Sequence, residues 1–109
     1  MEIGFVKKES VGVISVSGRL DASNAEELKD KFRSHLRKTH NFVMDLSKLE
    51  FLDSTGLGAI VACLKYSSEK NGDVVIANLQ SKPRMVFEIT RAYKIFDVFD
   101  DVNTAIKAL

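Results

Sequence analysis

The residues best suited to carry chemistry follow one another between positions 53 and 58, in the order Asp-Ser-Thr-Gly-Leu-Gly. Beyond them, apolar residues recur with helical spacing at Leu57, Ile60, Val61 and Leu64. Ser54 therefore fits the N-cap of a helix, a position that serine favours because its hydroxyl can accept a hydrogen bond from a free backbone amide. A hydroxyl at the end of a helix can be reached by another protein, so we expect Ser54 to be a candidate for covalent modification.

Catalysis by Ser54 itself would require a general base and an oxyanion hole. Ser54 does not stand in a G-x-S-x-G turn, and the histidines are His35, at the edge of a predicted helix, and His40, in a connection. We therefore expect no enzyme and no catalytic residue, and keep a small serine hydrolase as an alternative. The sequence also lacks the Cys/His spacing of a zinc site and the Gly-Lys pattern of a phosphate-binding loop, so no metal or cofactor is expected.

The helix that follows Ser54 is predicted to have an unusual surface, because it has no charged residue before Lys65. Its predicted outward face is small and uncharged, with Thr55, Ala59, Ala62 and Tyr66, and Gly58 is predicted on the flank. An ordinary surface helix is charged on that side. Either the helix is buried on two sides within its own domain, or its outward face is a docking surface. Docking is favoured because so short a chain has few elements left to cover a second face.

A phosphate on Ser54 would change this surface without unfolding the domain. It carries about −1.5 to −2 charges at neutral pH, and the free amides and dipole of a helix N-terminus favour negative charge. Beside Asp53, and with Asp21 expected nearby, the phosphate would form a negative patch that is costly to desolvate against a partner. The simpler alternative is that Ser54 is only a helix cap.

The bulk properties predict one small domain covering residues 1–109, with 45% hydrophobic residues. A net charge of +1 argues against nucleic-acid binding, which needs a concentrated basic surface. The apolar stretches are far shorter than a membrane span and the first residues do not resemble a signal peptide, so no membrane insertion is expected. A single cysteine, Cys63, is expected to be buried and fits a reducing, cytoplasmic location.

Two strands, Ile3–Lys7 and Val11–Ser17, are predicted to form an opening hairpin. The segment Gly18–Asp21 is expected to break the second strand. Asp21 or Ser23 would then cap a helix that runs to about Lys38. The core stripe of this helix is predicted at Ala25, Leu28, Phe32 and Leu36.

The rest of the chain alternates strands and helices. Strands are expected at Phe42–Leu46, Val74–Ala77 and Phe96–Phe99. The Ser54 helix is expected to end at Asn71-Gly72, with Gly72 in the left-handed conformation. Ser81 is expected to cap a third helix, Asp100 or Asp101 a fourth, and Met44 and Met85 to fill the core.

This alternation predicts an α/β domain with a mostly parallel sheet of four to five strands and about four helices. The apolar runs Phe42–Met44 and Val74–Ala77 suit strands covered on both faces. From the residues alone, it stays open whether helices cover one face of the sheet or both.

Three segments resemble the STAS domain of bacterial anti-sigma factor antagonists. They are Gly18-Arg19-Leu20-Asp21, the run Asp45-Leu46-Ser47 followed by Phe51 to Gly58, and Phe99-Asp100-Asp101-Val102. The resemblance extends over essentially the whole chain and implies a single STAS-type domain, with helices mainly on one face of the sheet.

The resemblance implies binding to an anti-sigma factor that is also a serine kinase of the histidine-kinase-like ATPase type. The unphosphorylated antagonist would sequester this kinase and free a sigma factor. The kinase, supplying ATP and Mg²⁺, would phosphorylate Ser54 and end the interaction, and a metal-dependent serine phosphatase would restore it. Thr55 is a minor alternative phosphosite. The expected partner-binding residues are Asp21, Ser23, Asp53, Ser54, Thr55, Gly56, Gly58, Ala59 and Ala62. A STAS interaction subunit of another regulatory or transport assembly is the alternative partner relationship.

Overall fold

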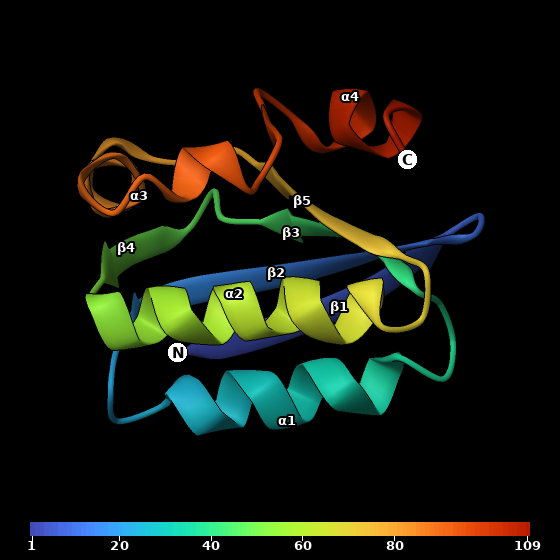
Figure 1. The fold of residues 1–109 in the computed structure, drawn as a ribbon, viewed down its shortest axis with the longest axis horizontal. Coiled ribbons are helices and arrows are strands. Elements are labelled where there is room, and N and C mark those ends of the chain that lie inside the picture. Colours follow the sequence, from blue (N-terminus) through green and yellow to red (C-terminus); the bar gives the residue numbers. More distant parts are fainter.

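The computed structural model describes residues 1–109, and it contains six strands, four α-helices and one short 3₁₀ helix (Figure 1). Their bounds are β1 Glu2–Lys8, β2 Val11–Leu20, α1 Ala25–His35, β3 Asn41–Asp45, β4 Leu49–Leu52, α2 Ser54–Ser68, β5 Asp73–Ala77, α3 Ser81–Ile89, η1 Ala92–Lys94, β6 Val98–Phe99 and α4 Val102–Lys107.

The strands form one sheet in the order β1-β2-β3-β5-β6. The opening pair β1 and β2 is antiparallel, and every other pairing is parallel. This confirms the predicted α/β fold, with an opening hairpin followed by a mostly parallel sheet. The parallel pairings also explain why helices connect the later strands, because parallel neighbours need a crossover.

The sheet has one strand more than the sequence predicted, and the extra strand is β4. β2 is ten residues long, whereas β3 pairs with it only from Val11 to Ser15. β4 then takes the place of β3 beside β2, pairing with Gly18–Leu20. The prediction that Gly18–Asp21 breaks the strand was therefore wrong. A register shift between Gly18 and Arg19, with Gly18 at φ 82°, lets β2 continue to Leu20.

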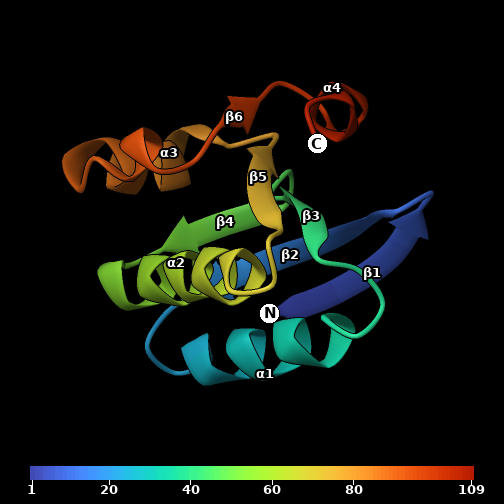
Figure 2. The ribbon, with the colours of Figure 1, turned by 45° about the vertical axis from the view of Figure 1, so that its right-hand side comes forward.

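Both faces of the sheet are covered, but unequally. Phe42 and Met44 of β3 lie in a large core cluster with residues of α1, α2 and α3. Val43, between them, lies in a smaller cluster with Ala105 of α4, as expected when successive side chains of a strand point to opposite faces. Figure 2 shows α4 across the sheet from α1 and α2. The residues predicted to form the inward stripe of the first helix, namely Ala25, Leu28, Phe32 and Leu36, are all buried, with Leu36 as the C-cap of α1.

Several helix boundaries differ from the predictions. α1 ends at His35 rather than near Lys38, and its N-cap is Asn24 rather than Asp21 or Ser23. Gln80, not Ser81, is the N-cap of α3, and Ser81 is the first helical residue. Asp101 does cap α4, and its Oδ1 accepts a hydrogen bond of 2.7 Å from the amide of Thr104.

Gly72 follows α2, but it does not have the left-handed backbone conformation that was predicted for it. The residue with positive φ is Asn71, at 62°, and not Gly72. A Cβ on Gly72 would overlap the backbone carbonyl of His40. The position requires glycine because two backbone segments touch there, which a pattern of helix-ending residues does not reveal.

Candidate functional site

Ser54 is the first residue of α2, and its side chain is exposed. The prediction that Ser54 is the N-cap was wrong, because Asp53 has that position. Asp53 has an extended backbone, with φ −107° and ψ 179°, and its Oδ1 accepts a hydrogen bond of 2.7 Å from the amide of Gly56. Because the carboxylate of Asp53 caps the helix, the Ser54 hydroxyl is left free of that task and faces solvent.

The loop between β2 and α1 is organised around Asp21. One carboxylate oxygen accepts hydrogen bonds from the amide of Ser23, at 3.0 Å, and from its hydroxyl, at 2.6 Å. Nε of Arg19 lies 3.7 Å from the other oxygen. The hydrogen bonds from Ser23, with a smaller contribution from the Arg19 charge, hold the pKa of the Asp21 carboxyl below its ordinary value. Asp21 therefore remains ionised at neutral pH.

Asp53 connects this loop to the start of α2. Its Oδ2 accepts a hydrogen bond of 3.3 Å from the amide of Ala22. The backbone amide of Asp53 donates to the carbonyl of Leu20, also at 3.3 Å. The structure thus brings together Asp21, Asp53 and Ser54, as expected, and Figure 1 shows the β2–α1 loop and the beginning of α2 at the same end of the molecule.

The surface of α2 differs from its predicted helical wheel. Ala59, expected to face outward, is 1% exposed, and Gly56 is also buried. A Cβ on Gly56 would overlap the carbonyl oxygen of Leu20 on β2. Both residues pack inside the domain, so their predicted placement on a partner surface was wrong.

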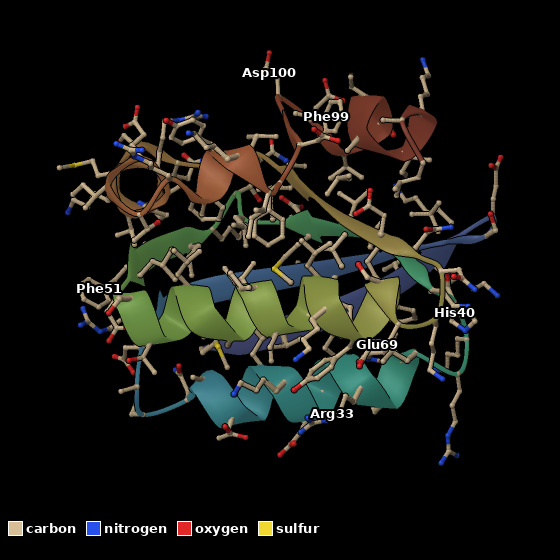
Figure 3. The ribbon with its side chains drawn as sticks, in the orientation of Figure 1. Arg33, His40, Phe51, Glu69, Phe99 and Asp100 are labelled. Atoms are coloured by element: carbon tan, nitrogen blue, oxygen red, sulfur yellow. The ribbon has the colours of Figure 1, made fainter.

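α1 also packs against one flank of α2. Tyr66 is half-buried there, and its hydroxyl accepts a hydrogen bond of 2.7 Å from a guanidinium nitrogen of Arg33 on α1. Figure 3 shows Arg33 extending from α1. The rest of α2 leaves a narrower exposed strip than predicted, formed by Ser54, Thr55 and Gly58, with Ala62 half-buried. This strip has no charged side chain.

An open groove that the sequence did not indicate lies beside Phe51, with a volume of about 910 Å³. It runs between β4 and the first turn of α3. Three of its lining residues are cationic, namely Arg19, Lys48 and Lys82, and one is acidic, Glu50. The Arg19 guanidinium stacks over the Phe51 ring, 3.9 Å from its centre. Because β4 was not predicted, no sequence pattern could place these residues together.

Exposed apolar side chains gather on α3 and the segment after it. They are Met85, Ile89, Tyr93 and Ile95, each more than half exposed. The expectation that Met85 fills the core was wrong, whereas Met44 is fully buried. The inward positions of α3 are occupied by Pro83 and Phe87 instead.

Neither histidine lies near Ser54. His35 is the last residue of α1, and the C-terminal end of α1 lies at the other end of the molecule from the start of α2 (Figure 1). Figure 3 shows His40 at that far end, with Phe51 at the other. No cluster of three or more His, Cys, Asp or Glu side chains is arranged to hold a metal ion. The helices are all too short or too polar to cross a membrane.

The STAS domain model matches residues 2–105 of the chain. Among characterised proteins, the chain is 22% identical over 111 residues to the anti-sigma F factor antagonist of Paenibacillus polymyxa, covering 100% of this chain and 95% of that protein. It is 26% identical over 85 residues to the anti-sigma-B factor antagonist of Bacillus subtilis, covering 78% of each.

Solved structures show the same fold. An anti-sigma factor antagonist from Mycobacterium paratuberculosis superposes with a TM-score of 0.87 and 25% identity, covering 98% of this chain and 92% of that one. The Bacillus cell fate determinant SpoIIAA in its phosphorylated form superposes with a TM-score of 0.75 and 18% identity, with 98% of each chain covered. With the family model matching nearly its full length, the chain belongs to the STAS domain family.

Proposed function

We propose that this protein is an anti-sigma factor antagonist that is switched off by phosphorylation of Ser54. Unphosphorylated, it binds an anti-sigma factor that is also a serine kinase, and thereby releases a sigma factor in the cytoplasm. A metal-dependent serine phosphatase reverses the modification. The observation that carries this proposal is the Ser54 hydroxyl, which is exposed at the first residue of α2 while Asp53 does the capping. The names of the relatives support the antagonist role.

In the proposed reaction, the Ser54 oxygen attacks the γ-phosphorus of ATP held by the kinase. ADP leaves with the electrons of the broken P–O bond, and the hydroxyl proton passes to a base. Both histidines of this chain lie at the far end of the molecule (Figures 1 and 3), so neither can take the proton, and we assign that base to the kinase. The chain acts as a substrate, needs no cofactor of its own, and is not the enzyme.

The docking surface that we propose consists of the exposed strip of α2 and the neighbouring loop, with Asp21, Ser23, Asp53, Ser54, Thr55, Gly58 and Ala62. Gly58 is the residue that most needs an explanation. No atom lies within 4 Å of the position that its Cβ would occupy, so nothing inside the domain requires glycine. In a helix, glycine costs roughly 1 kcal/mol relative to alanine. A partner backbone that approaches α2 closely would account for this choice.

Phosphate at Ser54 would act on binding rather than on the fold. The group adds about −1.5 to −2 charges beside the Asp53 carboxylate and the ionised Asp21 loop. The N-terminus of α2 tolerates negative charge, whereas a docking partner would have to desolvate three neighbouring anions. Binding is therefore lost while the domain stays folded.

The test begins with capture of partners from native cells by the wild-type chain, with phosphopeptide mass spectrometry of the bait. A histidine-kinase-like ATPase protein is expected among them, and phosphate is expected on Ser54. With the purified kinase, Ser54→Ala should bind like the wild type, and Ser54→Asp should bind more than about tenfold more weakly, a loss of about 1.4 kcal/mol.

Ser68→Asp is the matched control, because Ser68 is an exposed serine at the other end of the same helix. This variant should bind the kinase normally. Equal binding of the kinase by Ser54→Ala and Ser54→Asp would contradict the proposal that phosphorylation of Ser54 switches binding off. Capture of transporter subunits in place of a kinase would favour the alternative role as a subunit of another assembly.

A further inference from the structure

The Asp53 carboxylate makes more contacts than a helix cap requires. Capping needs one side-chain oxygen that accepts from an amide of the first turn. Oδ1 of Asp53 does this with Gly56 at 2.7 Å. Oδ2 points out of the helix and accepts from the amide of Ala22 at 3.3 Å, across 31 residues of sequence. One side chain therefore holds two separate segments of backbone.

The chain contains a second aspartate cap that serves as a comparison. Asp101 begins α4, and its Oδ1 accepts from the amide of Thr104 at the same distance of 2.7 Å. The other oxygen of Asp101 accepts no hydrogen bond from a distant segment, unlike Oδ2 of Asp53. The contact to Ala22 is thus a separate feature of the Ser54 site and does not follow from capping.

Ala22 lies between the two loop residues that we place on the docking surface. Asp21 binds the amide and hydroxyl of Ser23, and Asp53 binds the amide of Ala22. Together with the backbone of residues 21–23, these hydrogen bonds connect Ser23 to the residue next to Ser54. Movement of the loop relative to Ser54 requires breaking the contact between Asp53 and Ala22.

We propose that Asp53 is a positioning residue that fixes the Asp21–Ser23 loop against the start of α2, so that the kinase meets the loop and the Ser54 hydroxyl as one preformed surface. The inference rests on the proposed function. Preorganisation of this kind removes the cost of ordering the loop when the partner binds. Asp53 accordingly affects how tightly the kinase holds its substrate, and it does not take the proton of Ser54.

The experiment uses Asp53→Asn in the full chain. Asparagine retains one oxygen to cap the helix, but its amide nitrogen cannot accept a hydrogen bond from Ala22. Hydrogen exchange of the Ala22 amide should accelerate by about tenfold or more while Gly56 stays protected, because one hydrogen bond is lost. With the purified kinase and ATP, KM for the chain should rise by about tenfold and kcat should change by less than about threefold.

Two further variants make the result specific. Asp53→Ser keeps a good capping side chain that is too short to reach Ala22, so it should behave like Asp53→Asn. Asp101→Asn removes the same charge from the other capping aspartate, and it should leave both Ala22 exchange and the kinase kinetics unchanged.

Some results would overturn the positioning role of Asp53, and another would overturn the proposed function. A fall in kcat of about 100-fold with KM unchanged would make Asp53 a catalytic base and overturn the positioning role. Unchanged exchange at Ala22, or faster exchange with unaltered KM, would also overturn it. If the kinase does not phosphorylate the wild-type chain at Ser54, the proposed function itself fails, and the inference about docking falls with it.

Discussion

Two glycines in the first turns of α2 stand there for different physical reasons. Gly56 lies against β2, where a Cβ would overlap the carbonyl oxygen of Leu20. Gly58, two residues later, faces open space. From the sequence both glycines look alike, and both were placed on the docking surface. The structure gives Gly56 a packing role and leaves Gly58 without one inside the domain.

Alanine substitutions separate the two roles. Gly58→Ala should raise the free energy of unfolding by about 0.5–1 kcal/mol, because alanine favours the helix and meets no atom. Gly56→Ala should lower it by about 1–3 kcal/mol, because β2 and α2 must move apart. Urea denaturation followed by circular dichroism measures both changes.

Gly58→Ala also tests the docking surface. If a partner backbone approaches Gly58 closely, the stabilised variant should bind the kinase more weakly than the wild type. Unimpaired binding would remove Gly58 from the docking surface.

At the scale of the element, α2 combines a rigid attachment with an exposed N-terminus. Its first turn is held by Asp53, and its buried side by Leu57, Ile60 and Cys63. The first turn has no acidic residue after the cap, and Lys65 is the basic residue of the last turn. A negative charge added at Ser54 therefore meets the positive end of the helix dipole, next to the Asp53 carboxylate that already caps it.

Aspartate placed at the two ends of α2 should have opposite effects on stability. Ser54→Asp is expected to leave the free energy of unfolding unchanged or to raise it by about 0.3–1 kcal/mol, because negative charge is favourable at a helix N-terminus. Ser68→Asp is expected to lower it by a similar amount at the C-terminus. Thermal unfolding at low salt measures the difference, which should shrink as salt is added. A marked loss of stability in Ser54→Asp would mean that phosphorylation acts by unfolding.

At the scale of the whole molecule, α1, α2 and α3 share one core cluster, and Cys63 lies within it. The side chain of Cys63 is fully buried. Burial raises the pKa of the thiol to about 12. The thiolate, which is the reactive form, is therefore scarce at neutral pH and is also shielded from solvent.

Alkylation of Cys63 should report the opening of this core. At pH 8 in the native state, labelling by iodoacetamide should be at least about 100-fold slower than in urea-unfolded chain. Raising the pH to 9 should speed labelling of the unfolded chain while native labelling stays slow, because the native pKa remains far above that range. Mass spectrometry measures both rates, and rapid native labelling would show that α2 separates readily from the sheet.

The sequence by itself determined the features that depend on neighbours along the chain. Helical spacing correctly placed Leu28 and Phe32 of α1 in the core, and the apolar runs of β3 and β5 correctly indicated two strands. It also placed Ser54 at the start of a helix. These features follow from periodicities of 3.6 and 2 residues, which are local properties.

Only the tertiary structure decided which sides of those elements remain free. α1 covers the flank of α2 that contains Tyr66, β4 extends the pairing of β2 to Leu20, and Asp53 rather than Ser54 caps α2 while also binding Ala22. The contacts made by α1, by β4 and by Ala22 join segments distant in sequence, so no local pattern encodes them, whereas the cap joins Asp53 to Gly56 only three residues away. The local pattern identified an exposed hydroxyl at a helix start, and the tertiary packing determined how narrow the exposed strip of α2 around it is.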